Sequence, residues 1–258
     1  MKLNISGGYQ MKMHDYNRNG DKVVLLLHPM LASGLMMYEL LGKKMGEDVR
    51  CLAPDFASHG DESDQEYADA NTEADAILKY LHDNNISHID LAYGASLGGI
   101  ILTELLKHDL SFSTVFFEGT SFFENANTMT KIVSSVFIKK HQRAVNDYDR
   151  AVKAMGELYG EQFAVDFAKQ FIGMSENSIR NIAKSCGHNV HADLTPAMQK
   201  QCIFAYGSKD FNTFKAKGGC KKYYPHAKYI VWEGYGHCEK VVADTDAYVK
   251  MLKQYLNK

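Results

Sequence analysis

Residues 94–98, Gly-Ala-Ser-Leu-Gly, stand between an apolar run that ends at Tyr93 and a helix-like run that begins at Ile100. A strand, Gly-x-Ser-x-Gly and a helix, in this order, predict a sharp turn that exposes the hydroxyl of Ser96 at the helix N-terminus. Glycines are expected on both sides of the serine because a Cβ there would collide with the neighbouring strand and helix. The motif alone is weak, so its meaning depends on partners for Ser96 further along the chain.

Strand-like and helix-like segments alternate around this motif. Expected strands cover residues 3–5, 9–14, 23–27, 49–53, 89–93, 113–117, 202–206 and 229–232, the first two forming a hairpin. Expected helices cover residues 38–45, 71–83, 100–106, 129–141, 145–159, 161–172, 178–186, 214–222 and 240–256. This pattern predicts an α/β fold: a mostly parallel central sheet with helices on both faces.

The alternation is interrupted once, by a segment without an expected strand. We therefore expect an α/β core formed by residues 1–119 and 195–258, and a helical insertion at residues 120–194. Sites in such sheets lie beyond the carboxyl ends of the strands. Candidate functional residues are therefore sought directly after each expected strand.

Composition excludes several classes of protein. The chain has 258 residues, 45% of them hydrophobic, and a formal charge of −2, which favours neither a nucleic acid nor an anionic membrane as partner. No apolar run approaches the roughly 18 residues of a membrane span, and the N-terminus lacks the apolar core of a signal peptide. Five scattered cysteines without a Cys-x-x-Cys motif indicate reduced thiols. A cytoplasmic protein is expected, and a homodimer is compatible with the sequence.

A serine nucleophile needs a base and an acid. His237 follows the last expected strand and precedes the last helix, which is a suitable position for the base. Asp210 follows the preceding strand and is the favoured acid, because its loop neighbours that of His237 and the chain order is Ser, Asp, His. Glu118 also ends a strand, so it remains the alternative acid.

Backbone donors are expected to complete the site by binding a developing oxyanion. The N–H of Leu97 is one candidate, because it follows Ser96 at a helix N-terminus. The N–H of Met30, in the loop after residues 23–27, is the other. His28 in the same loop is interpreted as a residue that shapes the loop.

Other reactive side chains are weaker candidates. Cys238 adjoins His237, but adjacent loop residues usually point apart, so a thiol nucleophile is disfavoured. His188 and His191 lack a third ligand nearby, so no metal site and no cofactor are expected.

Together these motifs resemble the α/β-hydrolase superfamily over essentially the whole chain. The resemblance depends on residues 28–30 (His-Pro-Met), 54–63 (Pro-Asp-Phe-Ala-Ser-His-Gly-Asp-Glu-Ser), 94–99, 207–210 (Gly-Ser-Lys-Asp) and 236–237 (Gly-His). It implies that Ser96 is the nucleophile, Asp210 the acid and His237 the base, with Met30 and Leu97 forming the oxyanion hole. It also implies that residues 120–194 form a cap over the site. Pro29 and Ala95 depart from common patterns of the family and favour no single subfamily.

Apolar side chains of the insertion, with Met36 and Met37, are expected to pack together and in part to line an apolar pocket. Lys139, Lys140 and Arg143 are interpreted as a solvated helix face. The leading hypothesis is a serine hydrolase that cleaves a small-to-medium carboxylic ester through an acyl-enzyme on Ser96. A C–C bond hydrolase or lyase with the same residues, and a ligand-binding protein without turnover, are the alternatives.

Overall fold

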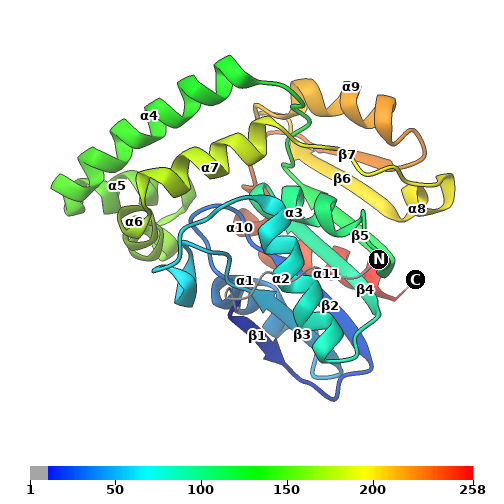
Figure 1. Cartoon of the computed structure of the whole chain (residues 1–258). Helices are drawn as coiled ribbons and strands as arrows, with labels where there is room; N and C mark the ends of the chain where they lie inside the picture. The colour runs from blue at the N-terminus through cyan, green and yellow to red at the C-terminus, as the bar shows by residue number, and fades with distance from the viewer. Residues whose placement is uncertain (1–10, 258) are drawn as a thin grey trace.

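A seven-stranded sheet forms the centre of the computed structural model, which describes residues 11–257 (Figure 1). Its strands are β1 (Met13–Tyr16), β2 (Lys22–Leu27), β3 (Val49–Pro54), β4 (His88–Ala95), β5 (Ser111–Glu118), β6 (Cys202–Gly207) and β7 (Lys228–Trp232). Their order across the sheet is β1-β3-β2-β4-β5-β6-β7, and each neighbouring pair is parallel except β1 and β3. The prediction of a mostly parallel sheet is confirmed.

The sheet is buried on both faces because successive side chains of a strand point in opposite directions. In β2, Leu25 and Leu27 belong to one apolar cluster, while Val24 and Leu26 belong to a second. All four side chains are fully buried. A continuous apolar run is therefore what a strand with two covered faces requires.

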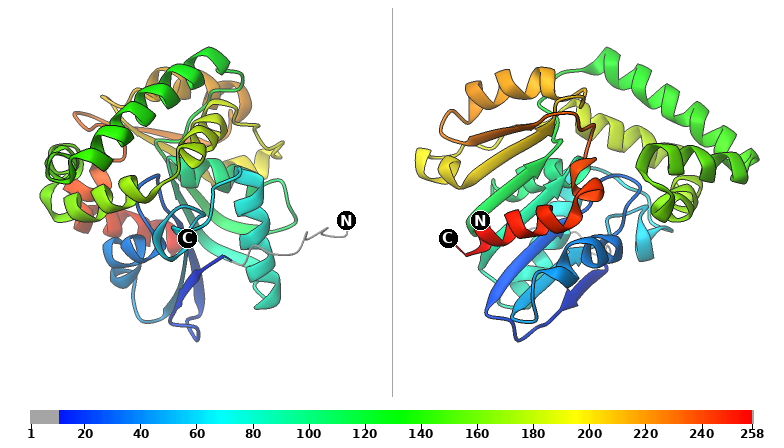
Figure 2. Two further views of the ribbon diagram at one scale, coloured as in Figure 1. Left: turned by 60° about the vertical axis from the view of Figure 1, so that its left-hand side comes forward. Right: turned by 180° about the vertical axis from the view of Figure 1, so that it is seen from behind.

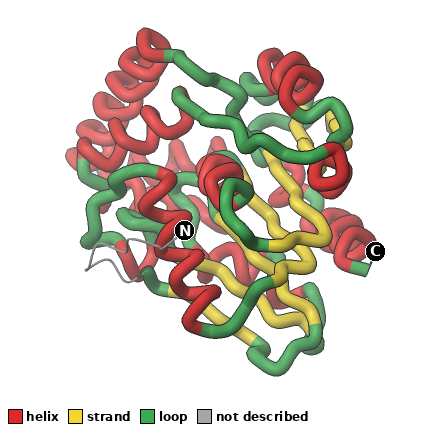
Figure 3. The backbone as a smooth tube through the Cα atoms, turned by 45° about the vertical axis from the view of Figure 1, so that its right-hand side comes forward, coloured by secondary structure: helices red, strands yellow, loops and turns green. Residues whose placement is uncertain are grey.

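Helices cover both faces of the sheet (Figures 1 and 3). Those of the core are α1 (Gly34–Leu40), α2 (Ala70–Asp83), α3 (Leu97–Leu105), α8 (Pro196–Gln201), α9 (Thr213–Tyr223), α10 (Lys240–Ala243) and α11 (Thr245–Leu256). Three short 3-10 helices cover Gly42–Lys44, Gly60–Glu62 and Glu161–Phe163. Among the described helices, none has both the length and the apolar character that crossing a bilayer requires.

The segment between β5 and β6 is helical, as expected. Its helices are α4 (Asn127–Asn146), α5 (Tyr148–Tyr159), α6 (Ala164–Gly173) and α7 (Glu176–Gly187). They form a group of their own at one side of the sheet, with α4 along its outer edge (Figures 1 and 2). We call residues 120–194 the helical insertion.

Several boundaries differ from the expectations, each for a local reason. The first helix begins at Gly34 rather than residue 38, because the Ser33 hydroxyl accepts a hydrogen bond from the Met36 N–H and caps it. Asp244 has an extended φ of −142°, and this divides the expected helix 240–256 into α10 and α11. Helix α8 was not expected, although Thr195 followed by Pro196 is a typical helix start.

The expected N-terminal hairpin falls mostly outside the described residues. Within them, β1 pairs antiparallel with β3, so this strand forms the edge of the central sheet.

Candidate active site

Ser96 lies in a sharp turn between β4 and α3. Its backbone has a φ of +50° and a ψ of −107°. Residues other than glycine rarely adopt a positive φ. The Ser96 N–H donates a 2.8 Å hydrogen bond to the carbonyl of Glu118 at the end of β5. The turn is thereby tied to the neighbouring strand, and strain of this kind persists only where the surroundings determine the conformation.

The glycines beside Ser96 are required by close backbone approaches. A Cβ on Gly98 would lie 2.2 Å from the carbonyl oxygen of Leu27, and one on Gly94 would lie 2.8 Å from that of Gly98. To make room for either Cβ, helix α3 would have to move away from strand β2 or strand β4. The collision expected from the sequence is therefore present, and β2 and α3 meet at van der Waals distance only because residue 98 has no side chain.

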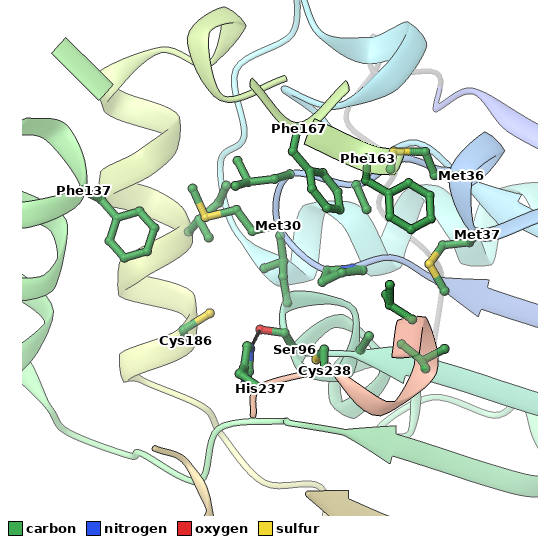
Figure 4. A pocket seen from close by; sticks show the side chains of 18 of the residues that line it. Met30, Met36, Met37, Ser96, Phe137, Phe163, Phe167, Cys186, His237 and Cys238 are labelled. Atoms are coloured by element: carbon green, nitrogen blue, oxygen red, sulfur yellow. Dashed lines mark hydrogen bonds between the residues drawn. The ribbon is translucent and has the colours of Figure 1, made fainter. Parts of the chain in front are cut away.

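Three side chains predicted from the sequence form one line of hydrogen bonds. The Ser96 hydroxyl lies 2.9 Å from Nε2 of His237 (Figure 4). The opposite ring nitrogen, Nδ1, lies 2.9 Å from Oδ2 of Asp210. Because an ionised carboxylate only accepts, Nδ1 carries the proton and Nε2 is left to accept from the serine. In this arrangement Nε2 of His237 is positioned to accept the proton of the Ser96 hydroxyl.

Asp210 is itself held in place by a residue that the sequence analysis did not identify. The N–H of Asn212 donates to Oδ1 of Asp210 at 2.9 Å, and the Asn212 side chain donates to the carbonyl of Gly119 at 2.8 Å. Both Asp210 and Asn212 are buried. Asn212 thus connects the loop after β6 to the loop after β5. Its position two residues after Asp210 was the available signal, since such residues often bond to an aspartate side chain.

Opposing influences act on the pKa of His237. Burial favours the neutral ring, whereas the hydrogen bond to Asp210 and the negative charge of that carboxylate favour the imidazolium. The balance places the pKa of His237 well above its usual value of 6.5. A hydrogen-bonded aspartate is therefore an effective stabiliser of the protonated ring that forms when His237 takes a proton.

Glu118, the alternative acid, has different partners. Its Oε2 accepts hydrogen bonds from the hydroxyls of Tyr93 at 2.5 Å and Tyr248 at 2.6 Å. The carboxyl is buried, and this burial raises its pKa above 4.5. The structure therefore places Asp210, and not the carboxyl of Glu118, against His237. Glu118 contributes to the site through its backbone carbonyl instead.

The two predicted backbone donors lie beside Ser96. Leu97 is the first residue of α3, where an N–H has no acceptor within the helix, and Met30 lies in the loop after β2. Both residues line the same cavity as Ser96. Fully buried His28 shapes the Met30 loop: its Nδ1–H donates to the Pro29 carbonyl at 2.8 Å, and its Nε2 accepts from the Phe56 N–H at 3.1 Å.

Ser96 opens onto an apolar cavity with a volume of about 350 Å³. Met36 and Met37 line it from α1, as expected, and the helical insertion contributes Phe137 and Phe163 (Figure 4). No Lys, Arg, Asp or Glu is among its lining residues in the described part of the chain. A smaller cavity of about 100 Å³ adjoins Ser96 and is lined by helices α4 and α7 and by the loops after β5 and β6.

Two cysteines line the larger cavity, Cys186 from α7 and Cys238 next to His237. Burial raises the pKa of Cys186 to about 11 and also raises that of Cys238. Both sulfurs are therefore thiols at neutral pH, the form that is poorly nucleophilic.

In the part of the chain that the structure describes, no group of metal-ligating side chains lies around Ser96. His191 stacks on Tyr223 with ring centroids 4.2 Å apart, and burial lowers its pKa to about 4. Within residues 11–257, one group has ligand-like spacing: His14, Asp55 and Asp61. Oδ1 of Asp55 accepts from the Gly34 N–H at 2.6 Å, and Oδ2 accepts from His14 and the Asp61 N–H. The carboxylate of Asp55 is therefore hydrogen-bonded by groups of the protein itself, and we interpret the three residues as a structural contact.

Comparisons with known proteins agree with this architecture. The model of the alpha/beta hydrolase family matches residues 24–244, so the chain belongs to this family. No curated protein is a significant sequence match to the chain.

Solved structures of the same fold include an esterase from Exiguobacterium antarcticum, with 18% identity, a TM-score of 0.73, and 96% of each chain covered. A bromoperoxidase from Bacillus anthracis has 14% identity and a TM-score of 0.74, covering 96% of this chain and 95% of its own. A thermophilic esterase from Thermogutta terrifontis has 13% identity and a TM-score of 0.72, covering 96% and 93%. At these identities the likeness concerns the fold.

Proposed function

We propose that this protein is a serine hydrolase that cleaves small-to-medium carboxylic esters through an acyl-enzyme on Ser96. The observation that carries the proposal is the line from Asp210 through His237 to Ser96, with both hydrogen bonds at 2.9 Å, ending at an apolar cavity. Acyl transfer needs such a line because a serine hydroxyl is a poor nucleophile until a base removes its proton.

In the first half of the reaction, Ser96 Oγ attacks the ester carbonyl while its proton passes to Nε2 of His237. The negative charge that develops on the carbonyl oxygen is stabilised by the N–H groups of Leu97 and Met30. His237 then donates its proton to the departing alkoxide, the C–O bond breaks, and an alcohol leaves. Asp210 stabilises the imidazolium throughout and does not itself take the proton.

In the second half, a water molecule attacks the acyl-enzyme. His237 removes its proton, the tetrahedral intermediate uses the same two N–H donors, and collapse returns the proton to Ser96 Oγ. The products are a carboxylic acid and an alcohol, and the enzyme is regenerated without any cofactor.

The cavity supports an uncharged, apolar substrate group. Its volume of about 350 Å³ lies within the range of roughly 300–1,000 Å³ that is typical of sites for small molecules. A charged acid chain would lose its hydration there without gaining a partner. We assign the larger cavity to an acyl chain of short to medium length, and residues 120–194 to a cap that supplies much of its wall.

The test uses p-nitrophenyl esters with acyl chains of increasing length, together with labelling by a fluorophosphonate. The expected result is a burst of p-nitrophenol, labelling at Ser96, and a fall in kcat/KM once the chain exceeds the cavity. The Ser96→Ala variant should lose both activity and labelling. Wild-type protein that hydrolyses no ester and is not labelled at Ser96 would overturn the proposal. The same panel includes dicarbonyl substrates with a cleavable C–C bond. Cleavage of these substrates, and not of the esters, would favour the alternative of a C–C hydrolase.

A further inference from the structure

Helix α4 carries an exposed apolar face beside the cavity. Ile132 is 60% exposed, Val136 is 46% exposed and Val133 is 38% exposed. Spacings of three and four residues place these side chains on one side of the helix. The opposite side, with Ser134 and Ile138, is buried against the rest of the insertion. This face is therefore turned away from the protein's own core.

Two phenylalanines on the other side of the cavity are also exposed. Phe211, in the loop before α9, is 69% exposed, and Phe214, in the first turn of α9, is 86% exposed. Phenylalanine is commonly buried, so two neighbouring exposed rings indicate a surface that contacts an apolar partner.

These two groups of side chains meet at the cavity next to Ser96. Val133 and Phe211 both line the larger and the smaller cavity, and Met129 lines the smaller one. Helices α4 and α9 lie along the top of the molecule in each view of Figures 1 and 2. We call the combined apolar patch the entrance surface: Met129, Ile132, Val133, Val136, Phe211 and Phe214.

The two helices that carry the entrance surface are rich in cations, of which Lys222 is paired with Glu124. Helix α4 contains Lys131, Lys139, Lys140 and Arg143, and helix α9 contains four lysines, yet neither helix contains an Asp or Glu. This local excess is concealed in the whole chain, which has 31 acidic and 29 basic residues. Lys139, Lys140 and Arg143 form no ion pair with the described residues. They continue the exposed side of α4 beyond Val136, since residues 136, 139, 140 and 143 are three or four apart.

We propose that the entrance surface docks on an anionic lipid bilayer, with its apolar side chains inserted at the headgroup boundary and the lysines of α4 and α9 bound to lipid phosphates. An exposed apolar face bordered by lysines is typical of helices that lie in such an interface. A lipid bilayer offers both an apolar layer and a negative surface, which a soluble ester does not. Docking would place the cavity mouth against the layer from which an apolar ester can enter. The net charge of −2 did not favour an anionic membrane as partner, because it sums these two basic helices with the more acidic rest of the chain.

The test measures co-flotation of Ser96→Ala protein with vesicles, so that turnover plays no part in the result. We expect binding to vesicles that contain about one third phosphatidylglycerol, and much weaker binding to phosphatidylcholine alone. Lys139→Gln with Lys140→Gln should weaken binding about 30-fold, and Ile132→Asn about fivefold, since each cation and each inserted apolar group contributes on the order of 1 kcal/mol. Added NaCl should weaken the binding as well.

Matched controls isolate the entrance surface. Leu158→Asn on α5 removes an apolar side chain that is 64% exposed, nearly the same as Ile132. Lys250→Gln with Lys253→Gln removes two lysines from α11, a helix of the core. Neither control should change vesicle binding, and neither Ile132→Asn nor the double α4 variant should change hydrolysis of a soluble ester.

Two results would overturn the proposal. The first is vesicle binding that is absent, or that the control and entrance-surface variants weaken to the same extent. The second is a stable dimer in light scattering that Ile132→Asn converts to monomer, because the surface would then be covered by a second copy of the chain. If the protein binds vesicles as expected but wild-type protein hydrolyses no ester, the proposed function is refuted while the docking surface remains supported.

Discussion

Gly119 lies directly behind the imidazole of His237. A Cβ on Gly119 would be 2.8 Å from Cε1 of the ring and 3.1 Å from Oδ2 of Asp210, and the residue has a φ of +62°. Gly119→Ala should therefore displace His237 from Ser96 and reduce kcat by about 100-fold or more, as a misplacement of about 1 Å does in positioned catalysis. Steady-state kinetics with a p-nitrophenyl ester, alongside thermal unfolding, measures the effect.

The control for this variant is Gly218→Ala in α9. Beyond the backbone of its own helix, nothing lies within 4 Å of a Cβ at this position, and alanine favours helix, so we expect normal kcat and a gain of about 0.5–1 kcal/mol in the free energy of unfolding. If Gly119→Ala kept wild-type kcat, the close packing behind His237 would be irrelevant to the reaction.

The pH dependence of activity should report His237. The neutral ring is the base, so kcat/KM should rise with pH through the pKa of His237, with a midpoint above the usual 6.5. Asp210→Asn removes a charge that favours the imidazolium. This variant should lower the midpoint and reduce kcat by about 10⁴-fold. Glu118→Gln serves as the comparison, since its side chain does not contact the ring; an equal loss in both variants would contradict the assignment of Asp210.

Cys238 should be dispensable for the chemistry. Burial keeps its thiol protonated, and the thiolate is the nucleophilic form. Cys238→Ala should therefore retain kcat/KM to within about threefold, whereas Ser96→Ala should lose nearly all of it. Mass spectrometry of the acylated intermediate identifies the attacking residue. An acyl group found on Cys238 in wild-type protein would show that the thiol, and not the hydroxyl, is the nucleophile.

Glu118 should make folding sensitive to pH. Its carboxyl has a pKa above 4.5 in the folded protein, so between 4.5 and that higher value the unfolded chain has released a proton that the folded chain still holds. The free energy of unfolding therefore falls with rising pH in this window. Glu118→Gln does not titrate, and its stability relative to wild type should increase from pH 4.5 upward in urea unfolding. A difference from wild type that stays constant over this pH range would mean that the Glu118 carboxyl ionises normally.

Much of the fold could be predicted because its strands are buried on both faces. Residues 23–27 and 202–206 are apolar throughout, and such runs are recognisable without knowing their neighbours. The positions of Ser96, Asp210 and His237 followed from the same logic, since each comes after a strand whose carboxyl end reaches the same edge. Helix α8 was missed because its six residues carry too little periodicity, although its cap was visible.

The sequence favoured Asp210 over Glu118 through the order of the chain, but it could not exclude Glu118. Glu118 ends β5 and Asp210 follows the neighbouring parallel strand β6, so both lie at the same edge of the sheet. The packing of Tyr93 and Tyr248 around Glu118 decides the direction of its side chain, and it involves residues 25 and 130 positions away. The roles of Gly119 and Asn212 were hidden for the same reason, because they depend on how two separate loops approach each other.

The turn at Ser96 has a consequence for how this chain can change. Its geometry depends on Leu27, Gly98 and the Glu118 carbonyl, which all belong to the core, whereas Phe137, Phe163 and other walls of the cavity belong to the helical insertion. The reacting atoms are thus held by the core, while one part of the cavity wall is encoded in a separate stretch of sequence. Insertions exchanged between relatives would alter which molecules enter while leaving the reacting atoms where they are, so the fold can diversify in specificity without rebuilding its chemistry.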